Sequence, residues 1–235
     1  MKIFLRSSEE IAEHTLAFRF EPERPLHFSA GQFGDFTLSG AQETDARGNT
    51  RAFSFANAPG QTEILIATRM RESAFKHELR RLPTGAALEL MGPMGNFTLP
   101  PDGGRPAVFL AGGIGITPVR SIVEEAVQRR LPQEIVVFHA NRTLAASAFL
   151  DDFRRWQRDY PRLRYIPTLS QEPAPGPEFQ HGRIDAAMLR RHLANPTRSI
   201  YYVVGPPAMV STIKGLLVEI GVPASQIRYE NFSGY

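Results

Sequence analysis

The chain has 235 residues, of which 42% are hydrophobic and 22% are charged, and its formal net charge is +3. This composition is typical of a globular protein with one large domain or two small ones. Acids and bases nearly balance, so the charge gives no reason to expect nucleic-acid binding. The chain has no cysteine, which excludes disulfides, thiolate-bound iron–sulfur clusters and cysteine-based zinc sites.

The same observations bear on location and metals. No apolar run approaches the roughly 20 residues of a membrane-spanning helix, and the apolar part of the N-terminus is too short for a signal peptide. We therefore expect no membrane insertion, and the lack of cysteine fits a reducing cytoplasm. The six histidines lack the spacing of metal ligands, so we predict no metal site.

Short apolar or alternating runs separated by prolines and glycines dominate the first part of the chain. They lie at 16–20, 33–38, 52–55, 64–67 and 88–91. Many short strands with turn residues between them indicate an antiparallel barrel or sandwich, and we predict a barrel. From Ser73 onward, Phe75, Leu79 and Leu82 recur at helical spacing until Pro83, so the barrel should carry one short helix.

After the proline- and glycine-rich stretch 100–106, strands and helices alternate. Strand-like runs lie at 107–111, 135–138, 163–169, 200–204 and 227–232, with helical patterns between most of them. Such alternation predicts a parallel sheet covered by helices on both faces. We therefore divide the chain into an antiparallel barrel domain, residues 1–101, and an α/β domain, residues 102–235.

The first strand and helix of the second half are joined by a glycine-rich turn, Gly112-Gly113-Ile114-Gly115-Ile116-Thr117-Pro118. A strand, a glycine-rich turn and a helix form the geometry that holds a phosphate, because the N–H groups at the helix start point at the anion. We expect Thr117 to cap this helix and Pro118 to stand in its first turn. Turns of this kind also serve as plain connections, and Pro118 replaces the third glycine of the dinucleotide fingerprint.

Three more motifs accompany this turn. They are Arg51-Ala52-Phe53-Ser54, Gly92-Pro93-Met94-Gly95-Asn96-Phe97 and Gly205-Pro206-Pro207-Ala208-Met209, and the chain stops at Glu230-Asn231-Phe232-Ser233-Gly234-Tyr235. In this order, across essentially the whole chain, the set resembles the ferredoxin–NADP reductase family of flavoprotein reductases. The resemblance implies FAD in the barrel, NAD(P)H in the α/β domain, and hydride transfer from NAD(P)H to FAD. Electrons then pass to a separate acceptor such as ferredoxin, flavodoxin or an oxygenase component.

The resemblance also assigns roles around the flavin. Arg51 would contact the flavin pyrophosphate, Phe53 would lie against the flavin, and Ser54 would sit near flavin N5. Phe53 stands where the family usually has tyrosine, which keeps an aromatic face and loses a hydroxyl. On local grounds Phe53 also suits the barrel core, and Arg51 also suits a solvated turn.

The start of the short helix would bind the FAD pyrophosphate through Ser73 and Ala74. Thr68 and Met70, at the end of the strand before it, would also bind the cofactor. A pyrophosphate site favours FAD over FMN, although Ser73 also suits a plain N-cap. Tyr235 would cover the flavin on its nicotinamide side, or belong to a disordered tail. Glu230 would supply a carboxylate near the flavin or face solvent.

For the nicotinamide nucleotide, the resemblance assigns the glycine-rich turn and the loop that faces it, namely Gly112, Gly113, Gly115, Thr117 and Pro118, with Gly205, Pro206 and Met209. Met209 is equally suited to the core of its helix. The second strand of this half is followed by Arg142 and no acid, so we favour NADPH over NADH, with an ordinary surface arginine as the alternative.

We expect Ser54, Thr117 and Tyr235 to act on the reaction itself, by tuning flavin N5, positioning the nicotinamide and covering the flavin. Two other functions stay open from the sequence. The chain would be an NAD(P)H:flavin reductase that releases reduced flavin, or a non-catalytic nucleotide-binding partner module. These 235 residues include no cysteine to hold an iron–sulfur cluster by thiolates, so we expect electrons to leave to a separate partner or small acceptor.

Overall fold

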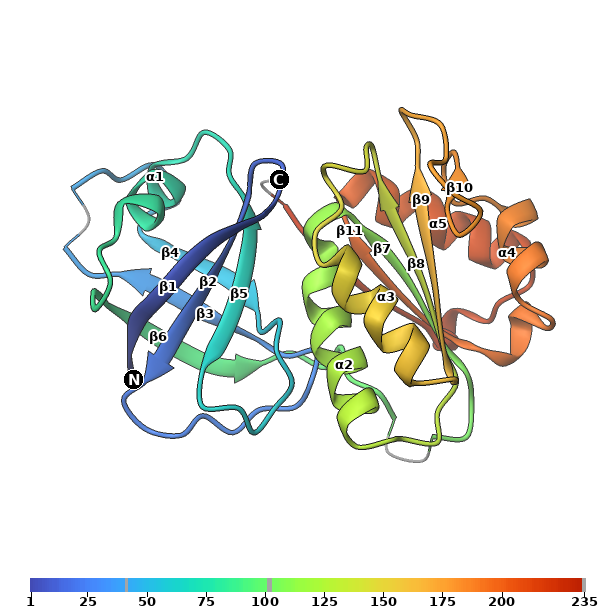
Figure 1. Ribbon diagram of the computed structural model, residues 1–235, viewed down its shortest axis with the longest axis horizontal. Coiled ribbons are helices and arrows are strands. Elements are labelled where there is room, and N and C mark those ends of the chain that lie inside the picture. The colour runs from blue at the N-terminus through green and yellow to red at the C-terminus, as the bar shows by residue number, and fades with distance from the viewer. Residues whose placement is uncertain (41, 101–102, 234–235) are drawn as a thin grey trace.

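Short antiparallel strands make up the first half of the computed structural model, which describes residues 1–40, 42–100 and 103–233 (Figure 1). They are β1 (Lys2–Ala12), β2 (Thr15–Pro22), β3 (Phe33–Leu38), β4 (Thr50–Ser54), β5 (Ile64–Arg69) and β6 (Ala87–Met94), with α1 (Ala74–Arg81) before β6. The strand order is β4-β3-β6-β1-β2-β5. The sheet curls so that its edges meet beyond β4, where Ala56 N donates to Leu65 O at 2.7 Å. The predicted barrel with one short helix is confirmed.

Phenylalanines at alternate strand positions fill this half-barrel. Phe36 on β3 lies 5.8 Å from the ring of Phe20 and 5.6 Å from the ring of Phe53. Helix α1 adds Phe75 and Leu79, both buried in the same cluster. Because the side chains of a strand alternate between two faces, Ala52 and Ser54 on β4 point away from this inward row.

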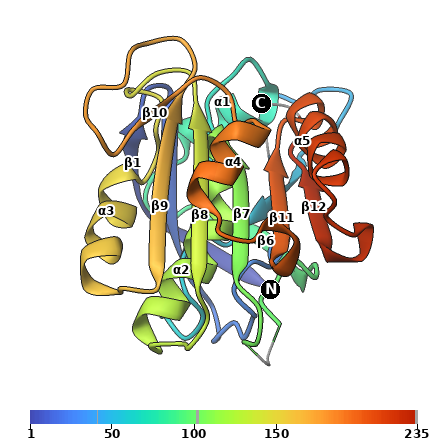
Figure 2. The same ribbon diagram turned by 90° about the vertical axis from the view of Figure 1, so that its right-hand side faces the viewer.

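The second half is a parallel sheet of six strands. They are β7 (Ala107–Gly112), β8 (Ile135–Asn141), β9 (Leu163–Leu169), β10 (Gln180–His181), β11 (Ile200–Gly205) and β12 (Ile227–Asn231). Figure 2 shows their order, β10-β9-β8-β7-β11-β12, and every neighbouring pair is parallel. The connecting helices are α2 (Ile116–Gln128), α3 (Leu150–Asp159), α4 (Ala186–His192) and α5 (Pro207–Glu219), with short 3₁₀ turns η1 (Gly113–Gly115), η2 (Pro196–Arg198) and η3 (Ala224–Gln226).

Helices cover both faces of this sheet, as the sequence predicts. On β7, Phe109 packs on the side of α2 and α3, whereas Val108 and Leu110 pack on the side of α4 and α5. All three side chains are fully buried. A strand that is buried on both faces reads as a continuous apolar run, which is why 107–111 is recognisable in the sequence.

The two halves share a core and a set of polar contacts. The cluster around α2 includes Leu65 and Ala67 from the barrel, and the ring of Phe97, just after β6, lies 5.2 Å from that of Tyr202 on β11. Helix α2 also binds the segment 56–58 that follows β4, since Ser121 Oγ donates to Asn57 O at 2.6 Å. The predicted domain boundary at 101/102 falls outside the described residues and stays a prediction.

The expected start of the helix after the glycine-rich turn is wrong. Gly113 to Gly115 form the 3₁₀ turn η1, and α2 begins at Ile116, so Thr117 lies inside the helix and is not its cap. The Thr117 hydroxyl donates back to Ile114 O at 3.1 Å. The tighter 3₁₀ turn continues directly into the α-helix, which leaves no extended residue at Thr117 to act as a cap.

Candidate functional site: two pockets that share one aromatic wall

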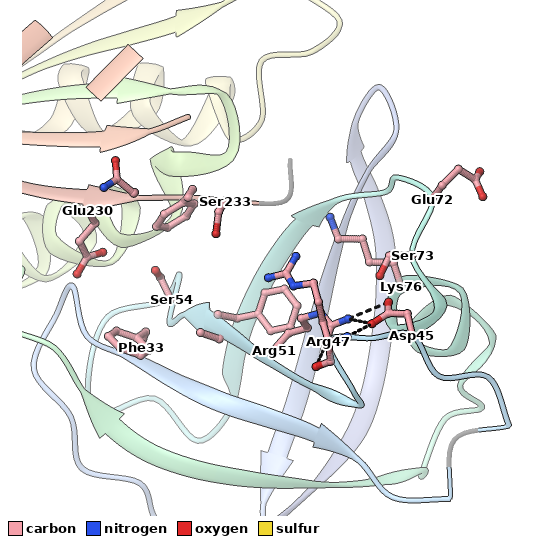
Figure 3. A pocket seen from close by; sticks show the side chains of 14 residues that line it. Phe33, Asp45, Arg47, Arg51, Ser54, Glu72, Ser73, Lys76, Glu230 and Ser233 are labelled. Carbon is pink, nitrogen blue, oxygen red and sulfur yellow. Dashed lines mark hydrogen bonds and ion pairs between the residues drawn. The ribbon is translucent and has the colours of Figure 1, made fainter. Parts of the chain in front are cut away.

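The first pocket lies on the barrel, between β4, α1 and the end of β12, and has a volume of about 430 Å³. Four residues expected at the flavin line it: Arg51, Phe53, Ser54 and Ser73. Figure 3 shows that the pocket has two ends, with Ser54 and Glu230 at one and the charged cluster around Arg51 at the other. The pocket is therefore polar and cationic at one end and bounded by the end of β12 at the other.

At the charged end, Arg51 is held by a neighbouring loop. Its Nη2 donates to both carboxylate oxygens of Asp45, at 2.8 and 3.0 Å, and its Nη1 donates to the carbonyls of Arg47, Gly48 and Thr50. The Arg51 side chain is 11% exposed. The guanidinium is thus fixed at the pocket wall, and an anion that binds there must share it with Asp45.

Lys76, in the first turn of α1, adds a second cation to this end. Its Nζ donates to Arg69 O at 2.7 Å. Burial, and then the positive charges of Arg71, Arg47, Arg51 and Arg69, lower the pKa of Lys76 to about 8. Positive charge is crowded here, which an anionic ligand would relieve. Ser73 is the N-cap residue of α1, but its side chain makes no capping hydrogen bond.

Ser54 and Phe53 end β4 beside each other and differ in their surroundings. Phe53 is 5% exposed and packs among the barrel phenylalanines, so the core role considered from the sequence is present, and only a small part of the ring reaches the pocket. The Ser54 hydroxyl makes no hydrogen bond within the described residues, and Figure 3 shows it facing the cavity. It is available to a ligand.

Glu230 and Phe232 form the wall contributed by the end of β12. Burial raises the pKa of Glu230 to about 7. Phe232 N donates to Gly205 O at 2.9 Å, which fixes the backbone after the strand to the loop that follows β11. Phe232 lines the first pocket and also the second one.

The second pocket has a volume of about 480 Å³ and lies at the carboxyl edge of the parallel sheet. The glycine-rich turn and the loop after β11 meet there. A Cβ on Gly115 would lie 2.9 Å from Val204 O, and a Cβ on Gly205 would lie 3.1 Å from Gly112 Cα. These glycines therefore allow two backbones to touch. Met209 and Pro206 pack on Gly112 and also line the pocket.

The charge of the second pocket is positive. Arg69, Arg71, Arg142 and Arg183 are among the residues that line it, and none of its described lining residues is acidic. Burial, followed by the charges of Arg71 and Arg142, lowers the pKa of Arg69. The carboxyl edge of an open parallel sheet is where nucleotides bind, and this one is built to receive an anion.

Comparison with known proteins agrees with this geometry. Residues 109–215 match the oxidoreductase NAD-binding domain. Reductase component 2 of terephthalate 1,2-dioxygenase from Comamonas is 25% identical over 220 residues, which are 93% of this chain and 63% of that protein. The crystal structure of an Amycolatopsis cytochrome P450 reductase superposes with a TM-score of 0.85 at 26% identity, over 99% of this chain and 70% of that one. A Neisseria gonorrhoeae ferredoxin NADP⁺ reductase with bound FAD and NADP has the same fold, with a TM-score of 0.82 at 18% identity, over 98% of each chain.

Over nearly its whole length the chain is similar to ferredoxin reductase-like proteins, and residues 109–215 match the NAD-binding domain of oxidoreductases. This ferredoxin reductase-like chain is shorter than its curated relatives: it spans 63% of the terephthalate dioxygenase component and 60% of the phenol hydroxylase P5 protein of Acinetobacter pittii. In the part that the structure describes, no helix has the length and apolar character needed to cross a membrane, and no three histidine or acidic side chains gather in a possible metal site.

The structure brings together only part of the set that the family resemblance assigns. Gly112, Gly113, Gly115, Arg142, Pro206 and Met209 line the second pocket, whereas Thr68, Met70, Ala74, Thr117, Pro118 and Gly205 line neither pocket. Thr117 is 2% exposed and its hydroxyl is used inside the turn, so direct contact with a nicotinamide finds no support in this geometry. Tyr235 lies outside the described residues.

Several pocket residues of this ferredoxin reductase-like chain were missed from the sequence. Ser170 and Gln171 line the second pocket directly after β9. The parallel strands gave a usable signal, because strand β9 ends at the same sheet edge as β8. Lys76 stands one helical turn after Ser73, so the sequence places its side chain near the pyrophosphate that was expected at Ser73. Nothing in the local sequence points to Asp45 as the partner of Arg51.

Proposed function

We propose that this chain is an NAD(P)H-dependent flavoprotein reductase, with FAD in the first pocket and the nicotinamide nucleotide in the second. The observation that carries the proposal is Phe232, a single aromatic side chain that lines both pockets. Ligands that fill the two pockets meet at this side chain. A fold with two nucleotide-sized cavities that adjoin in this way suits transfer between two cofactors.

The residues of the first pocket fit FAD. Arg51, Lys76 and Arg47 supply cations at the end where a pyrophosphate would lie. Ser54 offers a hydroxyl that has no hydrogen-bond partner among the described residues, at the other end, where the flavin ring would lie. When bound, FAD supplies the redox chemistry: it accepts a hydride from NAD(P)H and passes the electrons on.

The chain's own residues position the two ligands where the pockets adjoin. Phe232 lies where the two pockets adjoin and would orient the two ligands there. Glu230 titrates near neutrality, since burial raises its pKa to about 7, and it can hold or release a proton at its carboxylate beside the first pocket. The backbone contact between Phe232 and Gly205 keeps the shared wall attached to the loop of the second pocket.

NADPH is favoured over NADH as the electron donor. The support is the group of arginines in the second pocket, where Arg142 follows β8 and no acidic residue stands among the described lining residues. An arginine accommodates a ribose 2′-phosphate, whereas an acid at this edge selects the 2′-hydroxyl. Arg142→Ala should raise the KM for NADPH about tenfold or more and leave the KM for NADH nearly unchanged; an unchanged preference between the two would contradict this assignment.

The electron acceptor is proposed to be a separate protein, such as a ferredoxin, a flavodoxin or an oxygenase component. The names of the relatives support this class, since they include the reductase components of a terephthalate dioxygenase and a propane monooxygenase. The chain has no cysteine to hold an iron–sulfur cluster by thiolates. A cytoplasmic location stays a prediction from the sequence.

One preparation tests the proposal. The purified chain should be yellow, and anaerobic NADPH should bleach it while the flavin stays with the protein on gel filtration. Colourless protein that catalytically reduces added flavin would show instead a flavin reductase that releases its product. Colourless, inactive protein that binds the nucleotide would show a non-catalytic module.

A further inference from the structure

A buried hydrogen-bonded chain lies behind the glycine-rich turn. His139 on β8 is fully buried, with Nδ1 2.9 Å from the hydroxyl of Tyr165 and Nε2 3.0 Å from the carbonyl oxygen of Gly113. Tyr165 stands on the neighbouring strand β9 and is 4% exposed. Neither His139 nor Tyr165 lines a pocket, whereas Gly113 lines the second one.

These partners determine the protonation of the ring. A carbonyl oxygen only accepts hydrogen bonds, so His139 Nε2 must carry the proton that bonds Gly113. Burial lowers the pKa of His139 to about 4, so the ring is neutral at pH 7 and Nδ1 holds a lone pair. Burial also raises the pKa of Tyr165, so its hydroxyl stays protonated and donates a hydrogen bond to Nδ1. The hydroxyl of Tyr165 thus selects the tautomer that holds Gly113.

The direction of the Gly113 carbonyl determines how the backbone of the turn is oriented. Gly113 has a φ of +53°, and its carbonyl also accepts from Ile116 N at the start of α2. The peptide unit is planar and trans, so holding the Gly113 oxygen towards His139 aims the N–H of Ile114 in the opposite direction. Gly113, Ile114 and Gly115 all line the second pocket, so the orientation of this peptide decides which backbone groups face a ligand.

We propose that Tyr165 and His139 are positioning residues for the nicotinamide nucleotide: the Tyr165 hydroxyl fixes the His139 tautomer, and His139 holds the peptide of Gly113 in the shape that receives the ligand. The inference rests on the proposed binding of that nucleotide in the second pocket. It assigns a binding effect to a tyrosine on β9, which β8 separates from β7 and its turn, and which does not line the pocket.

The structure supplies a matched control. Tyr160, at the end of α3, is also buried, and its hydroxyl bonds Leu131 O at 2.6 Å and Gln133 O at 3.0 Å. These carbonyls precede β8, at the sheet edge opposite the pocket. Tyr160→Phe and Tyr165→Phe therefore remove the same buried group from the same domain, but only Tyr165→Phe reaches the turn.

The test measures NADP⁺ binding by calorimetry on FAD-loaded protein, with the flavin content and the unfolding midpoint as checks on folding. Tyr165→Phe should weaken NADP⁺ binding roughly two- to tenfold, the value of one neutral hydrogen bond, and Tyr160→Phe should leave it unchanged. His139→Phe should weaken it at least as much as Tyr165→Phe. Nitrogen NMR of the parent should show His139 protonated at Nε2.

Two results would overturn the inference while the proposed function stands: equal NADP⁺ affinity for Tyr165→Phe and Tyr160→Phe, or a parent His139 protonated at Nδ1. A parent protein that holds FAD but binds neither NADP⁺ nor NADH would overturn the proposed function itself, and this inference with it. The three results are separate readouts, so each failure can be attributed.

Discussion

Arg120 on α2 joins the two halves of the chain, and its substitution should weaken the contact between them. Its guanidinium donates to Ala56 O of the barrel at 2.7 Å, to Asp152 Oδ2 at 2.8 and 2.9 Å, and to Glu124 Oε2 at 3.2 Å. The side chain is 8% exposed and stacks over Trp156 at 5.1 Å. We predict that Arg120→Met destabilises the protein and loosens the attachment of α2 to segment 56–58.

The expected cost follows from what remains after the substitution. Breaking a buried ion pair from one side costs about 3–5 kcal/mol. Asp152 keeps Arg155 at 2.6 Å and Glu124 keeps Ala58 N at 2.7 Å, so neither carboxylate is left alone. The methionine retains packing against Trp156. We therefore expect the lower end, about 3 kcal/mol, which corresponds to a fall in Tm of roughly 6–12 °C for a chain of this size.

The assay is thermal and urea unfolding, and Arg129→Met is the matched control. Arg129 is the C-cap residue of the same helix and pairs with Glu125 four residues earlier at 2.9 Å, but its side chain is 66% exposed. An exposed pair of this kind contributes about 0–1 kcal/mol. If Arg120→Met cost no more than Arg129→Met, the claim that Arg120 joins the two halves would be refuted.

Three further predictions concern the first pocket. Asp45→Asn should strengthen FAD binding, because it releases Arg51 Nη2 from its competing carboxylate, whereas Glu43→Gln in the same loop should not; weaker binding by Asp45→Asn would contradict this competition. Burial raises the pKa of Glu230 to about 7, so the native state loses stability as pH rises from about 4.5 through 7. Glu230→Gln should therefore have a free energy of unfolding roughly 1–3 kcal/mol above that of the parent at pH 8 and about equal to it at pH 4. An equal gain in the free energy of unfolding at both pH values would count against this. The pKa of Lys76 is lowered to about 8, so FAD binding should weaken as pH rises through 8, and Lys76→Arg should flatten that dependence; an equally steep profile for the variant would assign it to another group.

Much of the fold was predictable because its strands are buried on both faces or alternate cleanly. The run at Leu163–Leu169 coincides with β9, and Phe33–Leu38 coincides with β3. The second half of strand β1, up to Ala12, was not predictable, because it is mostly exposed and is held by backbone pairing with β2. Exposed paired backbone leaves no hydrophobic pattern to recognise.

The site was less predictable, since it depends on contacts between distant segments. Helix α2 starts before Thr117 because η1 continues into it, which is a backbone property that residue types do not reveal. The shared wall is Phe232, whereas the sequence directed attention to Tyr235. The family resemblance predicted the two-domain fold, but the pairing of Arg51 with Asp45 depends on how one loop folds back.

The central claim is that FAD and the nicotinamide nucleotide bind in the two pockets that adjoin at Phe232. A crystal structure of the FAD-loaded protein with NADP⁺ tests it most directly. We expect the flavin ring between Ser54 and Phe232, the FAD pyrophosphate at Arg51 and Lys76, and the NADP⁺ pyrophosphate at the glycine-rich turn. Flavin density outside the first pocket, or NADP⁺ bound away from Gly113 to Gly115, would contradict it.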